Sequence, residues 1–303
     1  MRSRSLVALS ALAPSLIAAA EPVRVPPSTK WILDFAENSC KLSRGFGEGA
    51  HLIVLSFESE GPGSMDMLVI GRGLDTMKDE VSARFLPSGT VLDHGRPAVA
   101  ANDSRTAILW GGARLLPKSL DDRVEARDKS ANAAPRTRPA PIPKAQQDEE
   151  KAARHAFATA TTEIRIDSRR PVILETGSLG EAIESLDDCA RVSLRDWGVD
   201  PDMEDRIVRP VWAVDSNRWI SPNDYPGEML RGGHESEVNA RVLVDAGGHV
   251  TKCTSLSRYE QKEFNKVTCD KITQRAIFSP AELADGTKVA SYYTVRVRFK
   301  IAH

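Results

Sequence analysis

The sequence predicts an α+β protein. A mainly β N-terminal domain with one helix is followed by a C-terminal three-stranded antiparallel sheet covered by a helix. Short apolar runs separated by Gly, Pro and Asp recur through the first half, which is typical of a mainly β domain. Near the end, segments that alternate with a period of two flank a segment with helical periodicity. With 303 residues, 41% of them hydrophobic and 27% charged, the chain is expected to form two ordinary globular domains.

Residues 1–20 are predicted to be a cleaved signal peptide. Arg2 and Arg4 supply its positive start, an apolar stretch begins at Leu6, and Ala18-Ala19-Ala20 places small residues before a cleavage point at Glu21. The apolar stretch is shorter than the ~20 residues that a membrane-spanning helix needs. We therefore expect an exported protein without a stable membrane span, and an uncleaved inner-membrane anchor is the alternative.

The N-terminal domain is predicted to span residues 28–200 and matches no family that we recognise. Its strands are expected at the apolar runs Leu52–Phe57, Met65–Ile70, Val81–Leu86, Thr106–Trp110, Thr162–Asp167 and Val172–Glu175. One helix is expected over Leu179–Trp197, because apolar residues recur there every three or four positions. Residues 118–160 are charged and rich in Ala and Pro, so they predict a disordered insertion, with a helix over Gln146–Ala158 as the one ordered part.

The C-terminal domain is predicted to span residues 215–303. Alternation over Val238–Val244, followed by Gly247-Gly248, predicts a hairpin whose second strand runs from His249 to Ser257 with a bulge. Helical periodicity over Tyr259–Ile277 places an amphipathic helix on this sheet. The turn Phe278-Ser279-Pro280-Ala281 ends the helix, because the residue before a proline avoids the helical region.

The last strand, Tyr292–Ile301, has the clearest alternation in the chain. Its apolar side chains face the predicted helix, and the opposite face carries Tyr292, Thr294, Arg296, Arg298 and Lys300. If this strand lies at the edge of the sheet, its peptide groups are open to a visiting strand. We expect Arg296 and Arg298 to flank that contact, although a basic face that merely discourages aggregation is an equal alternative.

Residues 221–301 resemble the C-terminal domain of TonB-family energy transducers. The resemblance rests on an ordered set of pieces: Tyr225-Pro226, Gly247-Gly248-His249-Val250, Cys253, Cys269, Phe278-Ser279-Pro280-Ala281 and a terminal Val-x-Val-x-Phe strand. It implies a periplasmic module that pairs by strand addition with a short segment of an outer-membrane transporter. The chain departs from the family at Leu256-Ser257-Arg258, where a Ser-Ser-Gly turn is common, and it lacks a convincing membrane helix and Pro-rich spacer.

Four cysteines, an even number in an exported chain, predict two disulfides. Cys253 and Cys269 lie in a strand and a helix that should pack together, which leaves Cys40 to pair with Cys189. If the second pair forms, residues 118–160 are an insertion within one domain and do not separate two domains. Without a Cys-x-x-Cys motif, a redox role is disfavoured for either pair.

No motif for catalysis, metal binding or a cofactor stands out. The six histidines show no pair at ligand spacing, and Asp200–Asp205 lacks the Gly and distal Glu of a calcium loop. A net charge of −1 provides no electrostatic attraction to nucleic acid. We therefore expect no cofactor, no metal and no enzymatic activity.

Three functions remain open for the chain. The first is a periplasmic, non-catalytic module that binds an envelope protein, or a second copy of itself, through Tyr292–Ile301, with Tyr225 and Pro226 as further contacts. The second is a membrane-anchored TonB energy transducer. The third is an envelope enzyme or small-ligand binder that uses the N-terminal domain, which a deep pocket with converging Asp34, Glu37 or His94 would favour.

Overall fold

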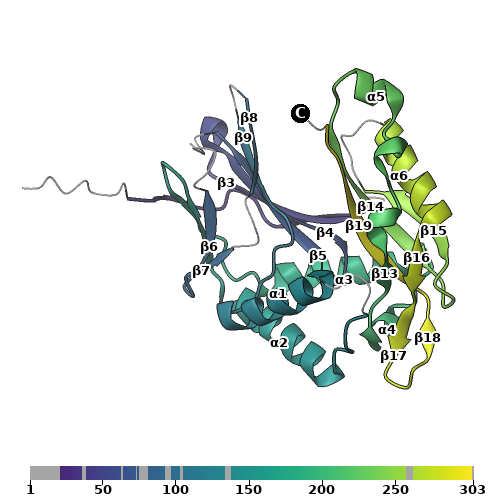
Figure 1. The fold of residues 1–303 in the computed structure, drawn as a ribbon. Helices are drawn as coiled ribbons and strands as arrows, with labels where there is room; N and C mark the ends of the chain where they lie inside the picture. The colour runs from purple at the N-terminus through teal and green to yellow at the C-terminus, as the bar shows by residue number, and fades with distance from the viewer. Residues whose placement is uncertain are drawn as a thin grey trace, which may run out of the picture.

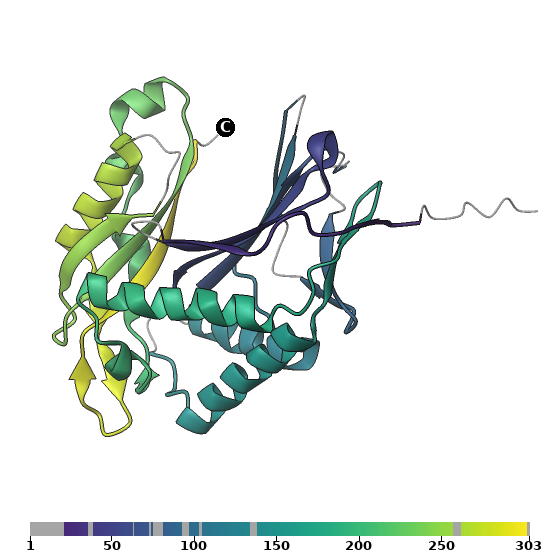
Figure 2. The same cartoon turned by 180° about the vertical axis from the view of Figure 1, so that it is seen from behind.

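The computed structural model describes residues 21–35, 39–62, 64–72, 74, 81–92, 97–102, 105–133, 138–256 and 262–301. The predicted signal peptide therefore lies outside the described residues, as do Glu37 and His94. Within these ranges, no helix has both the length and the apolar composition needed to cross a membrane. Figures 1 and 2 show two lobes, an N-terminal one of sheets and helices and a C-terminal one built on a helix-backed sheet.

The larger N-terminal sheet has six antiparallel strands in the order β2–β3–β4–β5–β9–β8. Alternating apolar residues of the central strands, such as Leu42, Phe57 and Met67, are fully buried on the side that α3 (Gly180–Trp197) covers. The strands are β2 (Ile32–Phe35), β3 (Cys40–Phe46), β4 (Ile53–Gly61), β5 (Ser64–Gly71), β8 (Ala98–Ala101) and β9 (Thr106–Trp110), and the turn η1 (Gly49–His51) precedes β4.

A second N-terminal sheet has five strands in the order β1–β11–β10–β6–β7, and only the pair β1–β11 is parallel. Phe85, Ile164 and Leu174 of this sheet join the same buried cluster as the core of the larger sheet. The two N-terminal sheets therefore share one hydrophobic core. The strands are β1 (Val23–Val25), β6 (Ser82–Leu86), β7 (Thr90–Leu92), β10 (Glu163–Asp167) and β11 (Val172–Leu174).

The prediction of a disordered insertion over residues 118–160 was wrong. This segment forms two helices, α1 (Lys118–Ala133) and α2 (Lys144–Ala160), and the second contains the predicted helix at Gln146–Ala158. Leu120 and Val124 are buried under α2, and the Arg127–Glu150 ion pair, at 2.6 Å, joins the two helices. The charged composition predicted disorder, but a few apolar residues on one face of each helix are enough for the helices to pack on each other and on the domain surface.

The predicted helix at Leu179–Trp197 is confirmed as α3 (Gly180–Trp197), which ends at Gly198 with φ of 82°. A left-handed residue at this position is the usual way for a helix to end. The chain continues through α4 (Pro201–Glu204) into two short strands, β12 (Ile207–Arg209) and β13 (Trp212–Val214).

The predicted three-stranded antiparallel sheet with a covering helix is confirmed. Its order is β15–β14–β19, and α6 packs on β14 and β15. The predicted bulge lies opposite Leu243 and Val244. The elements are β14 (Ser236–Val244), β15 (Val250–Ser255), α6 (Lys262–Arg275) and β19 (Ser291–Phe299); residues 257–261, where we expected the helix to begin, lie outside the described residues.

The segment Phe278–Ala281 is more than the turn that we predicted. It contributes to β16 (Ile277–Ser279), which pairs with β13, and to β17 (Ala281–Leu283), which pairs with β12 and with β18 (Lys288–Val289). Ile207, Val211 and Ala213 thereby join the core of the C-terminal lobe, upstream of the boundary at 215 that the sequence suggested. The remaining short elements are η2 (Ser216–Arg218), η3 (Pro222–Asp224) and α5 (Gly227–Arg231).

Both predicted disulfides are present. Cys40–Cys189 joins β3 to α3 with a Cα–Cα distance of 6.0 Å, and Cys253–Cys269 joins β15 to α6 at 5.5 Å. The first pair brackets α1 and α2, so both helices lie within the loop that this disulfide closes.

Candidate functional site at the edge of the C-terminal sheet

Strand β19 lies at an edge of the C-terminal sheet, as the strand-addition hypothesis requires. It pairs with β14 over its whole length, from Ser236↔Phe299 to Val244↔Ser291. On its other side, no strand among the described residues pairs with it. Nine residues of backbone therefore line one side of the C-terminal lobe (Figure 1).

The hydrogen-bond pattern tells which peptide groups of β19 point outward. Leu256 N donates to Asn239 O at 2.8 Å, so the odd-numbered residues of β14 direct their peptide groups to β15. Because the direction alternates along a strand, the even-numbered residues of β14 bond to their odd-numbered partners on β19. Ile301 N, which donates to Glu235 Oε1 at 2.7 Å, follows the same parity.

The outward-facing peptide groups of β19 are consequently those of the even-numbered residues. They belong to Tyr292, Thr294, Arg296 and Arg298, four of the residues that the sequence proposed for partner binding, and the alternation extends to Lys300. Val295 and Val297, which face the helix, use their peptide groups within the sheet.

The side chains of the basic face are exposed but not unpaired. Arg298 Nε donates to Glu237 Oε2 at 2.5 Å, and Arg296 Nε donates to Asn239 Oδ1 at 3.1 Å. Lys300 Nζ lies 3.6 Å from Glu235 Oε2. Exposed ion pairs of this kind stabilise a protein little. The acidic partners therefore orient these cations along the edge, but a binding partner could replace them at little cost.

Tyr292 differs from the other predicted residues because its side chain is used inside the molecule. Its hydroxyl donates to Pro62 O at 2.9 Å, and its ring meets Trp197 edge to face with the centroids 5.5 Å apart. Burial raises the pKa of this hydroxyl well above its usual value. Only the backbone of Tyr292 remains at the edge, so any role of this residue in pairing would be through its peptide group.

Tyr225 and Pro226 lie at the far end of β19. Tyr225 packs edge to face on Phe264 and Phe299, with both centroid distances 5.6 Å, and its hydroxyl donates to His234 O at 2.5 Å. Pro226 caps the short helix α5. The structure thus brings Tyr225 beside the last residues of β19, where an added strand would find an apolar ring on the helix side.

The other edge of the sheet is less suited to pairing. Strand β15 is shorter, a bulge interrupts its register, and the Cys253–Cys269 disulfide ties it to α6. Short and bulged edges are features that discourage strand addition. Of the two edges, β19 therefore offers the longer regular ladder.

Sequence reasoning missed the residues that join the sheet to the N-terminal lobe. The buried guanidinium of Arg241, on the central strand, stacks 3.4 Å over the ring of Trp197 from α3. Burial lowers the pKa of Arg241 to about 10. Nothing in the alternating pattern of β14 distinguished this arginine from a solvated one, because its partner is 44 positions away in the sequence and meets it only in the fold.

Two carboxyl groups lie at the same junction. Burial, reinforced by the neighbouring Asp66 and Glu58, raises the pKa of Glu60 to about 7. Burial likewise raises the pKa of Glu204 to about 7, although Ser291 Oγ donates a hydrogen bond to it at 2.7 Å. Both groups therefore hold their protons more tightly than an exposed glutamate does.

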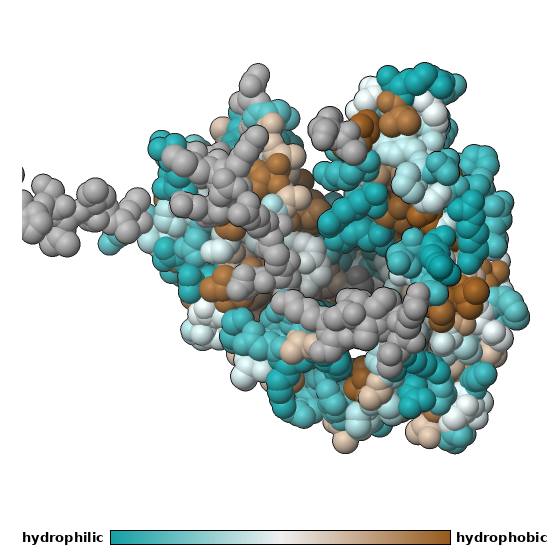
Figure 3. Space-filling model, viewed as in Figure 1, coloured by the Kyte–Doolittle hydropathy of each residue, from teal (hydrophilic) through white to brown (hydrophobic). Residues whose placement is uncertain are grey.

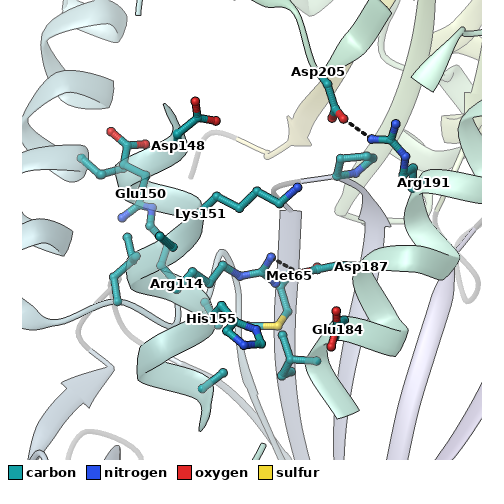
Figure 4. A pocket seen from close by; sticks show the side chains of 18 of the residues that line it. Met65, Arg114, Asp148, Glu150, Lys151, His155, Glu184, Asp187, Arg191 and Asp205 are labelled. Carbon is teal, nitrogen blue, oxygen red and sulfur yellow. Dashed lines mark hydrogen bonds and ion pairs between the residues drawn. The ribbon is translucent and has the colours of Figure 1, made fainter. Parts of the chain in front are cut away.

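A cavity of about 880 Å³ lies between α1, α2 and α3, with Met65, Ile183 and Leu194 among its apolar lining (Figure 4). Its arginines are tied to acids: Arg114 Nη2 lies 2.9 Å from Asp128 Oδ2, and Arg154 Nη1 lies 2.5 Å from Asp187 Oδ2. Asp34, which the enzyme or small-ligand alternative would need in a pocket, is exposed on the edge strand β2. The described residues contain no cluster of His, Cys, Asp and Glu that could hold a metal ion.

Comparison with known proteins identifies the lobe that carries β19. Residues 221–301 match the family model of the Gram-negative bacterial TonB protein C-terminal domain. This match confirms the resemblance that the sequence suggested and covers β14, β15, α6 and β19. No curated protein matches the chain.

Proposed function

We propose that this protein, whose residues 221–301 are a TonB C-terminal domain, is a periplasmic protein that binds an outer-membrane transporter by strand addition to β19. The family is one of protein-interaction modules without catalytic activity, and it takes part in TonB-dependent transport. The observation that carries the proposal is the row of outward peptide groups along the nine-residue edge strand. Export to an oxidising compartment agrees with the two disulfides.

The geometry predicts how an added strand would be recognised. Backbone hydrogen bonds from Thr294, Arg296 and Arg298 would supply affinity, and side chains at alternate positions would supply preference. On one face, the added side chains would lie beside Val297 and Tyr225. On the other, they would meet Arg296 and Arg298, which favours polar or acidic residues there.

The proposal can be tested by replacing Arg298 with the photoreactive amino acid p-benzoylphenylalanine in the full-length protein. Illumination of intact cells should give an adduct between this position and an extended segment of an outer-membrane transporter, identified by mass spectrometry. The matched control places the same amino acid at Thr251, an exposed position on β15. Adducts of equal yield from both positions, or none at Arg298, would contradict strand addition at β19.

A further inference from the structure

The cavity between α1, α2 and α3 is large enough to hold a small ligand. Its volume of about 880 Å³ lies within the range of roughly 300–1,000 Å³ that is usual for small-molecule sites. The outer surface over α1 and α2 is mostly hydrophilic (Figure 3), whereas the lining of the cavity includes the buried apolar side chains of Met65, Ile183 and Leu194. The class of ligand that fits depends on the charged groups that share this lining.

The arginines of the lining are compensated within the protein. Each of the four has a carboxylate partner that also lines the cavity: Arg114 with Asp128, Arg127 with Glu150, Arg154 with Asp187 and Arg191 with Asp205. A further lining carboxylate, Asp148, pairs with Lys144 of its own helix at 2.6 Å. None of these groups needs a ligand to meet an opposite charge.

Four other polar groups of the lining are left over. The side chains of Lys151 and His155 on α2, and of Glu184 and Asp188 on α3, form no hydrogen bond or ion pair with any part of the chain that the structure describes. Residues four positions apart lie on the same face of a helix. One wall of the cavity therefore offers hydrogen-bond donors and a positive charge, and the opposite wall offers two carboxylates; Figure 4 shows Lys151 and His155 on one side and Glu184 on the other.

The two walls do not neutralise each other, although the helices are packed together. The Arg154–Asp187 ion pair bridges α2 and α3 beside these groups and holds the helices at a fixed spacing. Lys151 and His155 still reach neither carboxylate of the facing wall. A molecule with a cation at one end and an anion at the other would form charge-assisted hydrogen bonds to both walls at once.

We propose that this cavity binds a short peptide whose two termini are free. The terminal ammonium contacts Glu184 and Asp188, the terminal carboxylate contacts Lys151 and His155, and the side chains of the peptide lie against the apolar part of the lining. The volume favours a peptide of a few residues over a single amino acid, and an extended tripeptide spans about 10 Å. This site lies in the N-terminal lobe and does not depend on strand addition at β19.

Titration calorimetry of the full-length protein with the tripeptide Ala-Leu-Ala tests the ligand class. We expect saturable binding of one peptide per chain. The N-acetylated and the C-amidated peptides should each bind about tenfold more weakly, because each has lost one terminal charge, and free leucine should also bind about tenfold more weakly. Absence of saturable binding up to about 10 mM tripeptide, or equal affinities for the free and the blocked peptides, would overturn the proposal.

Two variants assign each terminus of the peptide to its wall. Asp188→Asn should weaken binding of the free tripeptide about fivefold but leave the affinity for the N-acetylated peptide unchanged, and Lys151→Gln should do the same with respect to the C-amidated peptide. The matched control is Asp196→Asn, at an exposed position of α3 outside the lining, which should bind as the wild type does. Binding that neither Asp188→Asn nor Lys151→Gln weakens would place the peptide elsewhere and overturn the site.

Discussion

Glu60 and Glu204, at the junction between the lobes, make the stability of the folded protein depend on pH. Their pKa values are raised from 4.5 to about 7, so between these values the folded protein binds more protons than the unfolded chain. The stability that they contribute is thus fully present below about pH 4.5 and is lost as the pH rises through about 7. Both side chains are largely withdrawn from water by the contact between the lobes.

We expect the unfolding free energy of the wild type to fall between pH 5 and pH 8, and Glu204→Gln to flatten this dependence by about 1–2 kcal/mol. Urea denaturation at the two pH values measures the difference. Glu184→Gln, at an exposed position of α3, serves as the control that should keep the wild-type slope. If the wild type became more stable toward pH 8, the raised pKa values of Glu60 and Glu204 would be contradicted.

Asp224 acts in the opposite pH range. Its carboxylate accepts two hydrogen bonds from Arg275, at 2.7 and 3.1 Å, and others from Ser221, which together hold its pKa well below the usual value. The stability that the ionised Asp224 contributes is present above the pKa of Asp224 in the unfolded chain, about 3.8, and is lost as the pH falls below that value. Asp224→Asn should therefore lower the melting temperature at pH 7, and the difference from wild type should shrink at pH 3.

At the scale of elements, β19 has two kinds of peptide N–H, and proline distinguishes them. Arg296→Pro removes an N–H that points outward, which an edge strand tolerates, whereas Val297→Pro removes one that bonds to β14. We expect Val297→Pro to lower the melting temperature sharply and Arg296→Pro to keep the fold but lose the Arg298 photo-adduct. Arg296→Ala, which keeps the N–H, controls for the lost guanidinium and should retain the adduct.

The bulge in β15 explains why the two edges of one sheet should behave differently. A regular ladder presents donors and acceptors at even spacing, whereas a bulge breaks the spacing and twists the strand. The sequence signalled this bulge through the mismatch between Val250, Leu256 and Cys253. An element-level asymmetry was thus readable before the fold was known.

At the scale of the whole molecule, the Cys40–Cys189 disulfide cross-links positions 149 apart, against 16 for Cys253–Cys269. In the chain-entropy model, the longer loop stabilises by about 5 kcal/mol and the shorter by about 3 kcal/mol. We expect Cys40→Ser with Cys189→Ser to lower the unfolding free energy more than Cys253→Ser with Cys269→Ser. Guanidinium denaturation of the two double variants makes the comparison, and a larger loss for the C-terminal pair would contradict it.

The sequence by itself determined the elements whose signals are local. The alternation of Tyr292–Ile301, the Gly247-Gly248 turn and the helical spacing of Leu179–Trp197 each depend on neighbours within a few residues, and the structure reproduces all three. The cysteine pairing was also accessible, since four cysteines allow few arrangements once one strand and one helix are placed together. The edge position of β19 was a hypothesis that followed from the order of these elements.

Only the tertiary structure decided what required distant partners. The helix α1 looked disordered, although most of α2 was predicted, because its few apolar residues are buried only by packing against α2 and the domain beside it. The stack of Arg241 on Trp197, the raised pKa values of Glu60 and Glu204, and the contact of Gly61 with Tyr292 all arise where two lobes meet. Burial is a property of the whole packed chain, so a local pattern can place a side chain on a strand but cannot say which surface will cover it.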